Sequence, residues 1–249
     1  MDERDALRIS RAVAKNVLKA VSSIPLNRRG EFYDFGKSGV TKLVDKVAED
    51  AALEILRKEK LRILSEECGY VGEGDIFVAL DPLDGTFNAV RGIPIYSVSL
   101  CFSYSEKFGG AFFGYVFNLC SGDEYYATER AFKNEREIKV VEKDDPKETN
   151  AIVYYPDRSL PFKRIRALGS AALETCFVAE GLFDCFIDIR GMLRIFDVAG
   201  GIYILEKAGG IAADEKGDPL TNKRFELSER LNVVATNKRL FRKLLELIV

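Results

Sequence analysis

The acidic residues of one short segment are the first candidates for chemistry. An apolar run, Ile76 to Leu80, ends at Asp81, and Asp84 follows three residues later. The proline between the two acids predicts that the strand stops there, and the residues at 85–86 can open a helix with free backbone N–H groups. Two carboxylates for cations and two donors for an anion therefore converge on one turn.

Further acids stand at the ends of other predicted elements. The apolar run Leu61 to Ser65 ends in Glu66 and Glu67, and Asp197 precedes the helical run 198–206. If 61–65 lies parallel to 76–80, its end brings Glu66 close to Asp81, because ligands of open sheets gather at the carboxyl ends of strands. A metal site made of the four acids Glu66, Asp81, Asp84 and Asp197, with no histidine or cysteine among them, favours hard cations such as Mg²⁺.

Each of these acids also has a purely structural interpretation. Asp81 and Asp84 could belong to a capped turn, and Asp197 is of a type that often caps a helix. A phosphatase with a phosphorylated aspartate is disfavoured, since its two acids are two residues apart, whereas Asp81 and Asp84 are three apart. We therefore expect no covalent aspartyl intermediate.

The composition narrows the remaining chemistry. The 249 residues contain no histidine, which excludes histidine triads and HExxH zinc sites. The net charge is only −2 and neither sign of charge runs in long blocks, so the sequence gives no sign of the basic patch that binding to nucleic acid or an anionic membrane requires. No apolar run approaches the ~20 residues of a membrane span.

Five cysteines without a CxxC pair suggest reduced thiols and a cytoplasmic protein, with a bridge between Cys176 and Cys185 as the alternative. The absence of Trp and Gln fits a thermophilic source.

Hydrophobic periodicity indicates the elements that must position these acids. Helices are predicted over 4–22 and 43–57, and the glycine-bearing stretch 28–39 between them is a hairpin or a mobile loop. Strands are predicted over 61–65, 76–80, 96–104, 111–117, 124–128, 151–155, 183–189, 211–213 and 232–236, and later helices over 171–180, 198–207 and 238–249. The charged stretch 142–148 divides the chain into an N-terminal α+β subdomain, 1–145, and a C-terminal α/β subdomain, 146–249. The aromatic cluster between Phe102 and Phe117 is expected in the sheet core or at a dimer face.

Several motifs together resemble the inositol monophosphatase family, and most closely its archaeal branch, whose members also hydrolyse fructose 1,6-bisphosphate. The motifs are Glu66-Glu67, the run 81–88 (DPLDGTFN), 169–172 (GSAA) and 197–201 (DVAGG) followed by 206–210 (EKAGG). They occur in family order and cover nearly the whole chain. The resemblance implies an α+β fold, the layered αβαβα sandwich of the sugar phosphatases.

The resemblance also implies roles for individual residues. The metal ligands would be Glu66, Asp81, the backbone carbonyl of Leu83, Asp84 and Asp197, holding two or three Mg²⁺ ions, with Mn²⁺ as a substitute. Thr86 would position the attacking water with Asp45 holding its hydroxyl, Glu66 would share the catalytic role, and the phosphate would contact Asp84, Gly85 and Thr86. Ser170, Ala171, Arg166 and Arg190 would bind the rest of the substrate.

Some positions differ from the family pattern or allow a plainer interpretation. Phe196 stands where the family commonly has Trp, and the mobile loop lacks its usual aspartate, with Asp34 as the nearest substitute. Arg166 and Arg190 could read the second phosphate of a bisphosphate or simply pair with surface acids, as could Arg194. Tyr154 and Tyr155 could line the pocket or pack in the core.

We therefore expect a Mg²⁺-dependent phosphomonoesterase acting on inositol 1-phosphate and fructose 1,6-bisphosphate, in which metal-activated water attacks in line. The partners expected are this small sugar or inositol phosphate and a second copy of the chain in a homodimer. The alternatives are a family member specialised for another ester, such as a 3′-phosphoadenosine nucleotide, and a non-catalytic protein that binds metal or sugar phosphate.

Overall fold

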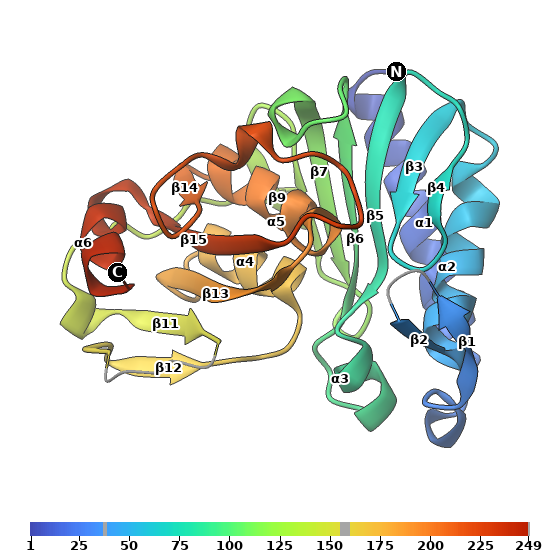
Figure 1. Ribbon diagram of the computed structural model, residues 1–249, viewed down its shortest axis with the longest axis horizontal. Helices are drawn as coiled ribbons and strands as arrows, with labels where there is room; N and C mark the ends of the chain where they lie inside the picture. Colours follow the sequence, from blue (N-terminus) through green and yellow to red (C-terminus); the bar gives the residue numbers. More distant parts are fainter. Residues whose placement is uncertain (37–38, 155–159, 249) are drawn as a thin grey trace.

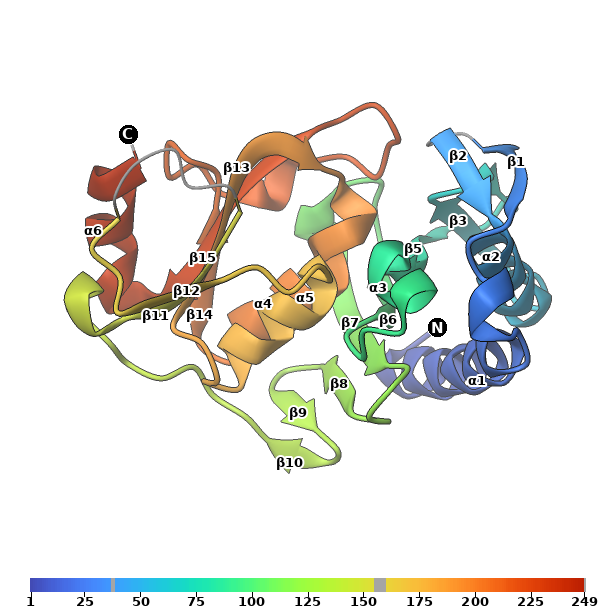
Figure 2. The same cartoon turned by 90° about the horizontal axis from the view of Figure 1, so that it is seen from below.

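The computed structural model describes residues 1–36, 39–154 and 160–248, which form five stacked layers of helices and sheets. The helices are α1 (Glu3–Ser22), α2 (Leu43–Leu56), α3 (Thr86–Arg91), α4 (Ala171–Ala179), α5 (Ile195–Lys207) and α6 (Lys238–Ile248). The strands are β1 (Phe32–Gly36), β2 (Gly39–Lys42), β3 (Leu61–Ser65), β4 (Gly69–Val71), β5 (Ile76–Asp84), β6 (Ser97–Ser103), β7 (Ala111–Asn118), β8 (Glu124–Ala127), β9 (Ala131–Lys133), β10 (Arg136–Glu137), β11 (Asn150–Val153), β12 (Arg164–Arg166), β13 (Cys185–Leu193), β14 (Gly210–Ala213) and β15 (Leu231–Asn237). The layer order, α1 and α2, first sheet, α4 and α5, second sheet, α6, confirms the predicted αβαβα sandwich (Figures 1 and 2).

The first sheet has eight strands in the order β10-β9-β8-β7-β6-β5-β3-β4, and α1 and α2 cover one of its faces. Helix α1 begins at the Asp2 cap, whose side chain accepts hydrogen bonds from the backbone N–H groups of Arg4 and Asp5. Its apolar stripe, which includes Ile9, Val13 and Val17, is buried against the sheet. The amphipathic periodicity of the sequence therefore predicted this layer correctly.

The middle layer, α4 and α5, packs against both sheets. A Cβ atom on Gly114 of β7 would lie 2.7 Å from the carbonyl oxygen of Gly200 in α5. The absence of both side chains is what allows this helix to approach the first sheet so closely. Buried residues of α5, such as Ile202, then form one apolar core with residues of both sheets.

The second sheet has the order β12-β11-β13-β15-β14, and α6 covers its outer face (Figure 1). It is mixed: β11 runs parallel to β12 and β13, whereas β15 is antiparallel to its neighbours. The first sheet ends at Glu137 and the second begins at Asn150, on either side of the predicted boundary. Because α4 and α5 contact both sheets, the division into subdomains 1–145 and 146–249 stays a prediction.

Several local expectations can be compared with the structure. The hairpin between the first two helices is present as β1 and β2, and Phe102, Phe112 and Phe113 lie in the core. The sequence missed β4, β9, β10 and β12, which are two or three residues long. Tyr155, Val249 and the two residues at 37–38 lie outside the described residues.

The five cysteines, Cys68, Cys101, Cys120, Cys176 and Cys185, are all free thiols, so the alternative bridge between Cys176 and Cys185 is wrong. Within 1–36, 39–154 and 160–248, no helix combines the length and the apolar character that crossing a bilayer demands.

Candidate active site

The acids at the point where the pairing of β3 with β5 ends lie next to each other. These strands pair in parallel, and Ser65 opposite Leu80 is the last pair, so Glu66 and Asp81 follow it side by side. The prediction of a parallel pair is confirmed. Both pKa values lie well above the ordinary range. Burial is the main cause, and the charge of Asp197 adds to the rise at Glu66 while the charge of Glu66 adds to the rise at Asp81.

The expectation that the proline at 82 ends the strand is wrong. Strand β5 continues to Asp84, and its pairing with β6 shifts between Asp81, opposite Ser99, and Asp84, opposite Ser97. The proline lies inside this bulge, where the ladder requires no N–H group from it. The Asp81 Oδ1 atom accepts a hydrogen bond of 2.9 Å from the backbone of Leu83 and holds the bulge in shape.

Asp84 is held by the beginning of α4. Its carboxylate accepts hydrogen bonds from Ser170 Oγ at 2.6 Å and from the backbone N–H groups of Ala171 at 3.2 Å and Ala172 at 2.8 Å. Burial raises the pKa of Asp84 to about 6, and these three donors limit the rise. Asp84 thus satisfies the first N–H groups of a helix more than 80 residues away.

Asp197 lies within α5 rather than before it. The helix begins at Ile195, so the expected cap position is wrong by one turn. The Asp197 Oδ2 atom accepts a hydrogen bond of 2.7 Å from the backbone N–H of Arg194. Burial raises the pKa of Asp197 to about 7, with the charge of Asp84 adding to the rise and that of Arg194 opposing it.

This set of donors fits divalent cations. Neighbouring carboxylates raise the pKa values of Glu66, Asp81 and Asp197, which means that negative charge is concentrated where a cation would relieve it. The guanidinium of Arg194 lies 3.5 Å from Glu66 Oε1 and offsets part of that charge. In the part of the chain that the structure describes, no three Asp, Glu or Cys side chains come close enough to hold a metal ion unaided. Coordination would therefore also need backbone, water or substrate oxygens.

Thr86 and Asp45 form the contact that the family resemblance implies. The Thr86 hydroxyl donates a hydrogen bond of 2.8 Å to Asp45 Oδ1, and burial raises the pKa of Asp45. Gly85, directly before Thr86, has φ of +96°, and a Cβ there would lie 3.0 Å from the carbonyl oxygens of Gly169 and Ile95. Only glycine makes this turn without strain.

The two arginines expected to bind substrate have different surroundings. Arg190 donates hydrogen bonds of 2.9 and 2.5 Å to Asp188, which is fully buried, and its guanidinium lies 4.3 Å from the centre of the Tyr154 ring. The surface-acid interpretation of Arg190 is therefore wrong. Arg166 is exposed at the edge strand β12 and donates a hydrogen bond of 2.8 Å to the carbonyl of Ile165.

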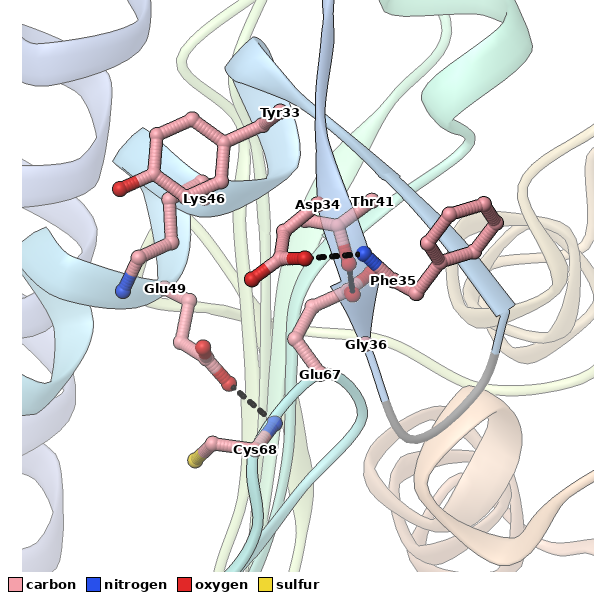
Figure 3. A pocket seen from close by; sticks show the side chains of 9 residues that line it. All are labelled: Tyr33, Asp34, Phe35, Gly36, Thr41, Lys46, Glu49, Glu67 and Cys68. Carbon is pink, nitrogen blue, oxygen red and sulfur yellow. Dashed lines mark hydrogen bonds between the residues drawn. The ribbon is translucent and has the colours of Figure 1, made fainter.

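A cavity of about 400 Å³ lies beneath the β1–β2 hairpin. Figure 3 shows its lining, which includes Asp34 from β1 and Glu67 from the segment after β3. The hydroxyl of Thr41 donates a hydrogen bond to Glu67, while Asp34 Oδ1 accepts one from the backbone of Phe35. Glu67, which lines the cavity, directly follows Glu66 in the chain. The acid cluster itself, Glu66, Asp81, Asp84 and Asp197, does not line the cavity.

The fold and the site together define a class: a phosphatase built as an α+β sandwich, with acids gathered where strands and helices of both halves meet. The sequence profile described as the inositol monophosphatase family matches residues 4–249. The chain belongs to the inositol monophosphatase family, whose enzymes are generally metal-dependent.

Individual relatives agree with this assignment. An Archaeoglobus fulgidus protein named fructose-1,6-bisphosphatase/inositol-1-monophosphatase is 60% identical over 252 residues, covering 100% of both chains. A solved inositol monophosphatase–fructose 1,6-bisphosphatase superimposes with a TM-score of 0.85 at 29% identity, covering 97% of each chain. A Pyrococcus horikoshii structure, described as similar to inositol-1 monophosphatase, has a TM-score of 0.84 at 28% identity, covering 99% of this chain and 97% of that one.

Proposed function

We propose that this chain is a Mg²⁺-dependent phosphomonoesterase that hydrolyses inositol 1-phosphate and fructose 1,6-bisphosphate. The observation that carries the proposal is the concentration of Glu66, Asp81, Asp84 and Asp197, whose pKa values are all raised. The names of the similar archaeal proteins support the two substrates.

The four carboxylates and the carbonyl oxygen of Leu83 would hold two or three Mg²⁺ ions, with Mn²⁺ as a substitute. Bound there, such ions would lower the pKa of a water molecule and neutralise charge on the phosphate and on the leaving oxygen. The hydrogen bonds from Ser170, Ala171 and Ala172 fix Asp84 in one orientation. Such fixed ligands need little rearrangement on binding.

Thr86 orients the attacking water. Because its hydroxyl hydrogen is committed to Asp45, its oxygen lone pairs can accept a hydrogen bond from that water. Glu66, to which the family resemblance also gives a catalytic role, would accept the proton of this water. Water forms a bond to phosphorus as the ester bond on the opposite side breaks, so no phosphoenzyme is formed. The phosphate contacts Asp84 and the N–H groups of Gly85 and Thr86.

The rest of the substrate contacts Ser170 and Ala171, while the arginines bind the second phosphate of the bisphosphate. Arg190 is preorganised by Asp188 for such a contact, and the exposed Arg166 is accessible to solvent. Because inositol 1-phosphate lacks a second phosphate, these arginines favour fructose 1,6-bisphosphate.

The proposal extends to the setting of the protein. We propose a cytoplasmic homodimer of two-subdomain protomers; the free thiols of all five cysteines support a reducing compartment.

A panel of phosphate esters tests the proposed function. Phosphate release is measured from fructose 1,6-bisphosphate, inositol 1-phosphate and a 3′-phosphoadenosine nucleotide, each with Mg²⁺ and with EDTA. Mg²⁺-dependent release from the first two, at higher kcat/KM than from the nucleotide, supports the proposal. Preference for the nucleotide would indicate the specialised alternative, and no release from any ester would indicate a binding protein.

A further inference from the structure

Glu174, in the first turns of α4, is a buried acid that the proposed function does not use. It has no exposed surface, and burial raises its pKa to about 8. A buried carboxyl group needs hydrogen-bond donors to offset its lost hydration. Glu174 has two: the backbone N–H of Leu168 at 2.5 Å to Oε1 and the Tyr154 hydroxyl at 2.7 Å to Oε2.

Tyr154 holds Gly169, the residue after Leu168, in the same way as Glu174 holds Leu168. Its hydroxyl donates to Glu174 and accepts a hydrogen bond of 3.0 Å from the backbone N–H of Gly169. Glu174 and Tyr154 thus bind two consecutive backbone amides. From the opposite side, the Asn88 side-chain amide donates a hydrogen bond of 2.7 Å to the carbonyl of Leu168. The segment 168–169 is therefore fixed on both sides.

The residues that follow this fixed segment bind Asp84. Ser170 and the two N–H groups after it supply the three hydrogen bonds to the Asp84 carboxylate. Gly169 has φ of +88°, so it makes a turn that leads the chain from the Glu174 contact to the Asp84 contact. A displacement of 168–169 would reach both Ser170 and Ala171.

The ring of Tyr154 also contacts Arg190, which is proposed above to bind substrate. The guanidinium of Arg190 lies 4.3 Å from the ring centre, while Asp188 holds its Nε and Nη2 atoms. The edge of Phe186 supports the ring, with centroids 6.1 Å apart. Tyr154 therefore contacts Arg190 with its face and the 168–169 segment with its hydroxyl.

We propose that Glu174 and Tyr154 are positioning residues that hold Ser170, Ala171 and Arg190 in place for substrate. The inference rests on the proposed function, because the substrate contacts are those proposed above. It assigns the pair no contact with the reacting atoms. Its consequence is that the pair controls substrate affinity more than the chemical step.

The test compares Tyr154→Phe and Glu174→Gln with a matched control, Tyr125→Phe. Tyr125 is also buried and donates a hydrogen bond of 2.5 Å to a glutamate, Glu180, at the opposite end of α4. Tyr154→Phe keeps the ring against Arg190 but removes the hydroxyl. Glu174→Gln keeps an acceptor for Leu168 but turns an amide donor toward Tyr154.

Two readouts separate positioning from general stability. Hydrogen–deuterium exchange over residues 165–173 should be about tenfold faster in both test variants than in Tyr125→Phe. Tyr154→Phe removes the acceptor of the Gly169 N–H, and Glu174→Gln removes the acceptor of the Tyr154 hydroxyl, which otherwise holds that tyrosine against the segment. The KM for fructose 1,6-bisphosphate should rise about tenfold, with kcat within about threefold. Unchanged exchange, or a KM equal to that of Tyr125→Phe, would overturn the inference, as would a loss of kcat without a rise in KM.

The exchange measurement needs no substrate. A wild-type chain that hydrolyses none of the esters would therefore refute the proposed function and, with it, the substrate role of the pair, whereas the exchange rates would still decide whether Glu174 and Tyr154 fix the segment.

Discussion

Asp197→Asn should stabilise the metal-free protein at neutral and alkaline pH. The folded-state pKa of Asp197 is about 7, against an ordinary value of 3.8. Between these values the folded protein binds the proton that the unfolded chain releases, so the free energy of unfolding falls as pH rises from about 4 to about 7. Asparagine retains an acceptor for the N–H of Arg194 without the charge.

The magnitude follows from the shift. Roughly 3 pKa units at ~1.4 kcal/mol each give about 4 kcal/mol for a fully shielded group. Asp197 is only partly buried, so screening by solvent reduces this, and we expect the variant to be about 2 kcal/mol more stable at pH 8. Below pH 4 the carboxyl group is protonated in both states, and this stabilisation disappears.

Urea unfolding with EDTA, at several pH values from 4 to 8, measures the difference. Glu246→Gln, an exposed acid on α6, is the control and should follow the wild type throughout. Added Mg²⁺ should stabilise the wild type more than Asp197→Asn, because a ligand that binds only the folded state stabilises it. A stability difference between Asp197→Asn and wild type that does not change with pH would refute the reasoning.

Three further predictions concern the site. Asp84→Asn should abolish Mg²⁺-dependent phosphate release, because it removes a charge from the acid cluster, while near-ultraviolet circular dichroism stays native; wild-type turnover would contradict the assignment. Arg166→Ala should lower kcat/KM more for fructose 1,6-bisphosphate than for inositol 1-phosphate, and equal losses would show that it does not read the second phosphate. Gly85→Ala should lower the free energy of unfolding by about 1 kcal/mol or more, because φ is +96° and the new Cβ meets two carbonyl oxygens at 3.0 Å; denaturant unfolding that matches the wild type would exclude this strain.

The helices and strands that form the layers, and the meeting of Glu66 with Asp81, were predictable from residue spacing, whereas the αβαβα order of the layers came from the family resemblance. Apolar runs of five residues that end in acids indicate strand ends, and parallel neighbours bring such ends together. The periodicity of α1, with its acidic cap, likewise identifies a helix that buries one face. These features depend on local spacing, which a single sequence contains.

The hydrogen-bond partners that hold the buried acids were not predictable from local spacing. Asp84 is fixed by residues 86 to 88 positions further along the chain, and Glu174 and Tyr154 are 20 positions apart. Periodicity gives no indication of which buried polar groups become partners, since partners are chosen by tertiary packing. The end of β5 was not predictable for the same reason. Only the pairing of β5 with β6 shows that a bulge accommodates the proline at 82 and lets the strand continue past it. One usable signal for Glu174 was an acid within the otherwise apolar first turns of a predicted helix.

The most direct test of the account measures phosphate release from fructose 1,6-bisphosphate by the purified chain in Mg²⁺, in EDTA, and after Mg²⁺ is restored. The account predicts release in Mg²⁺, its loss in EDTA and its recovery on restoration. Release that persists in EDTA, or none in Mg²⁺, would contradict the claim that these carboxylates form a metal-dependent phosphatase site.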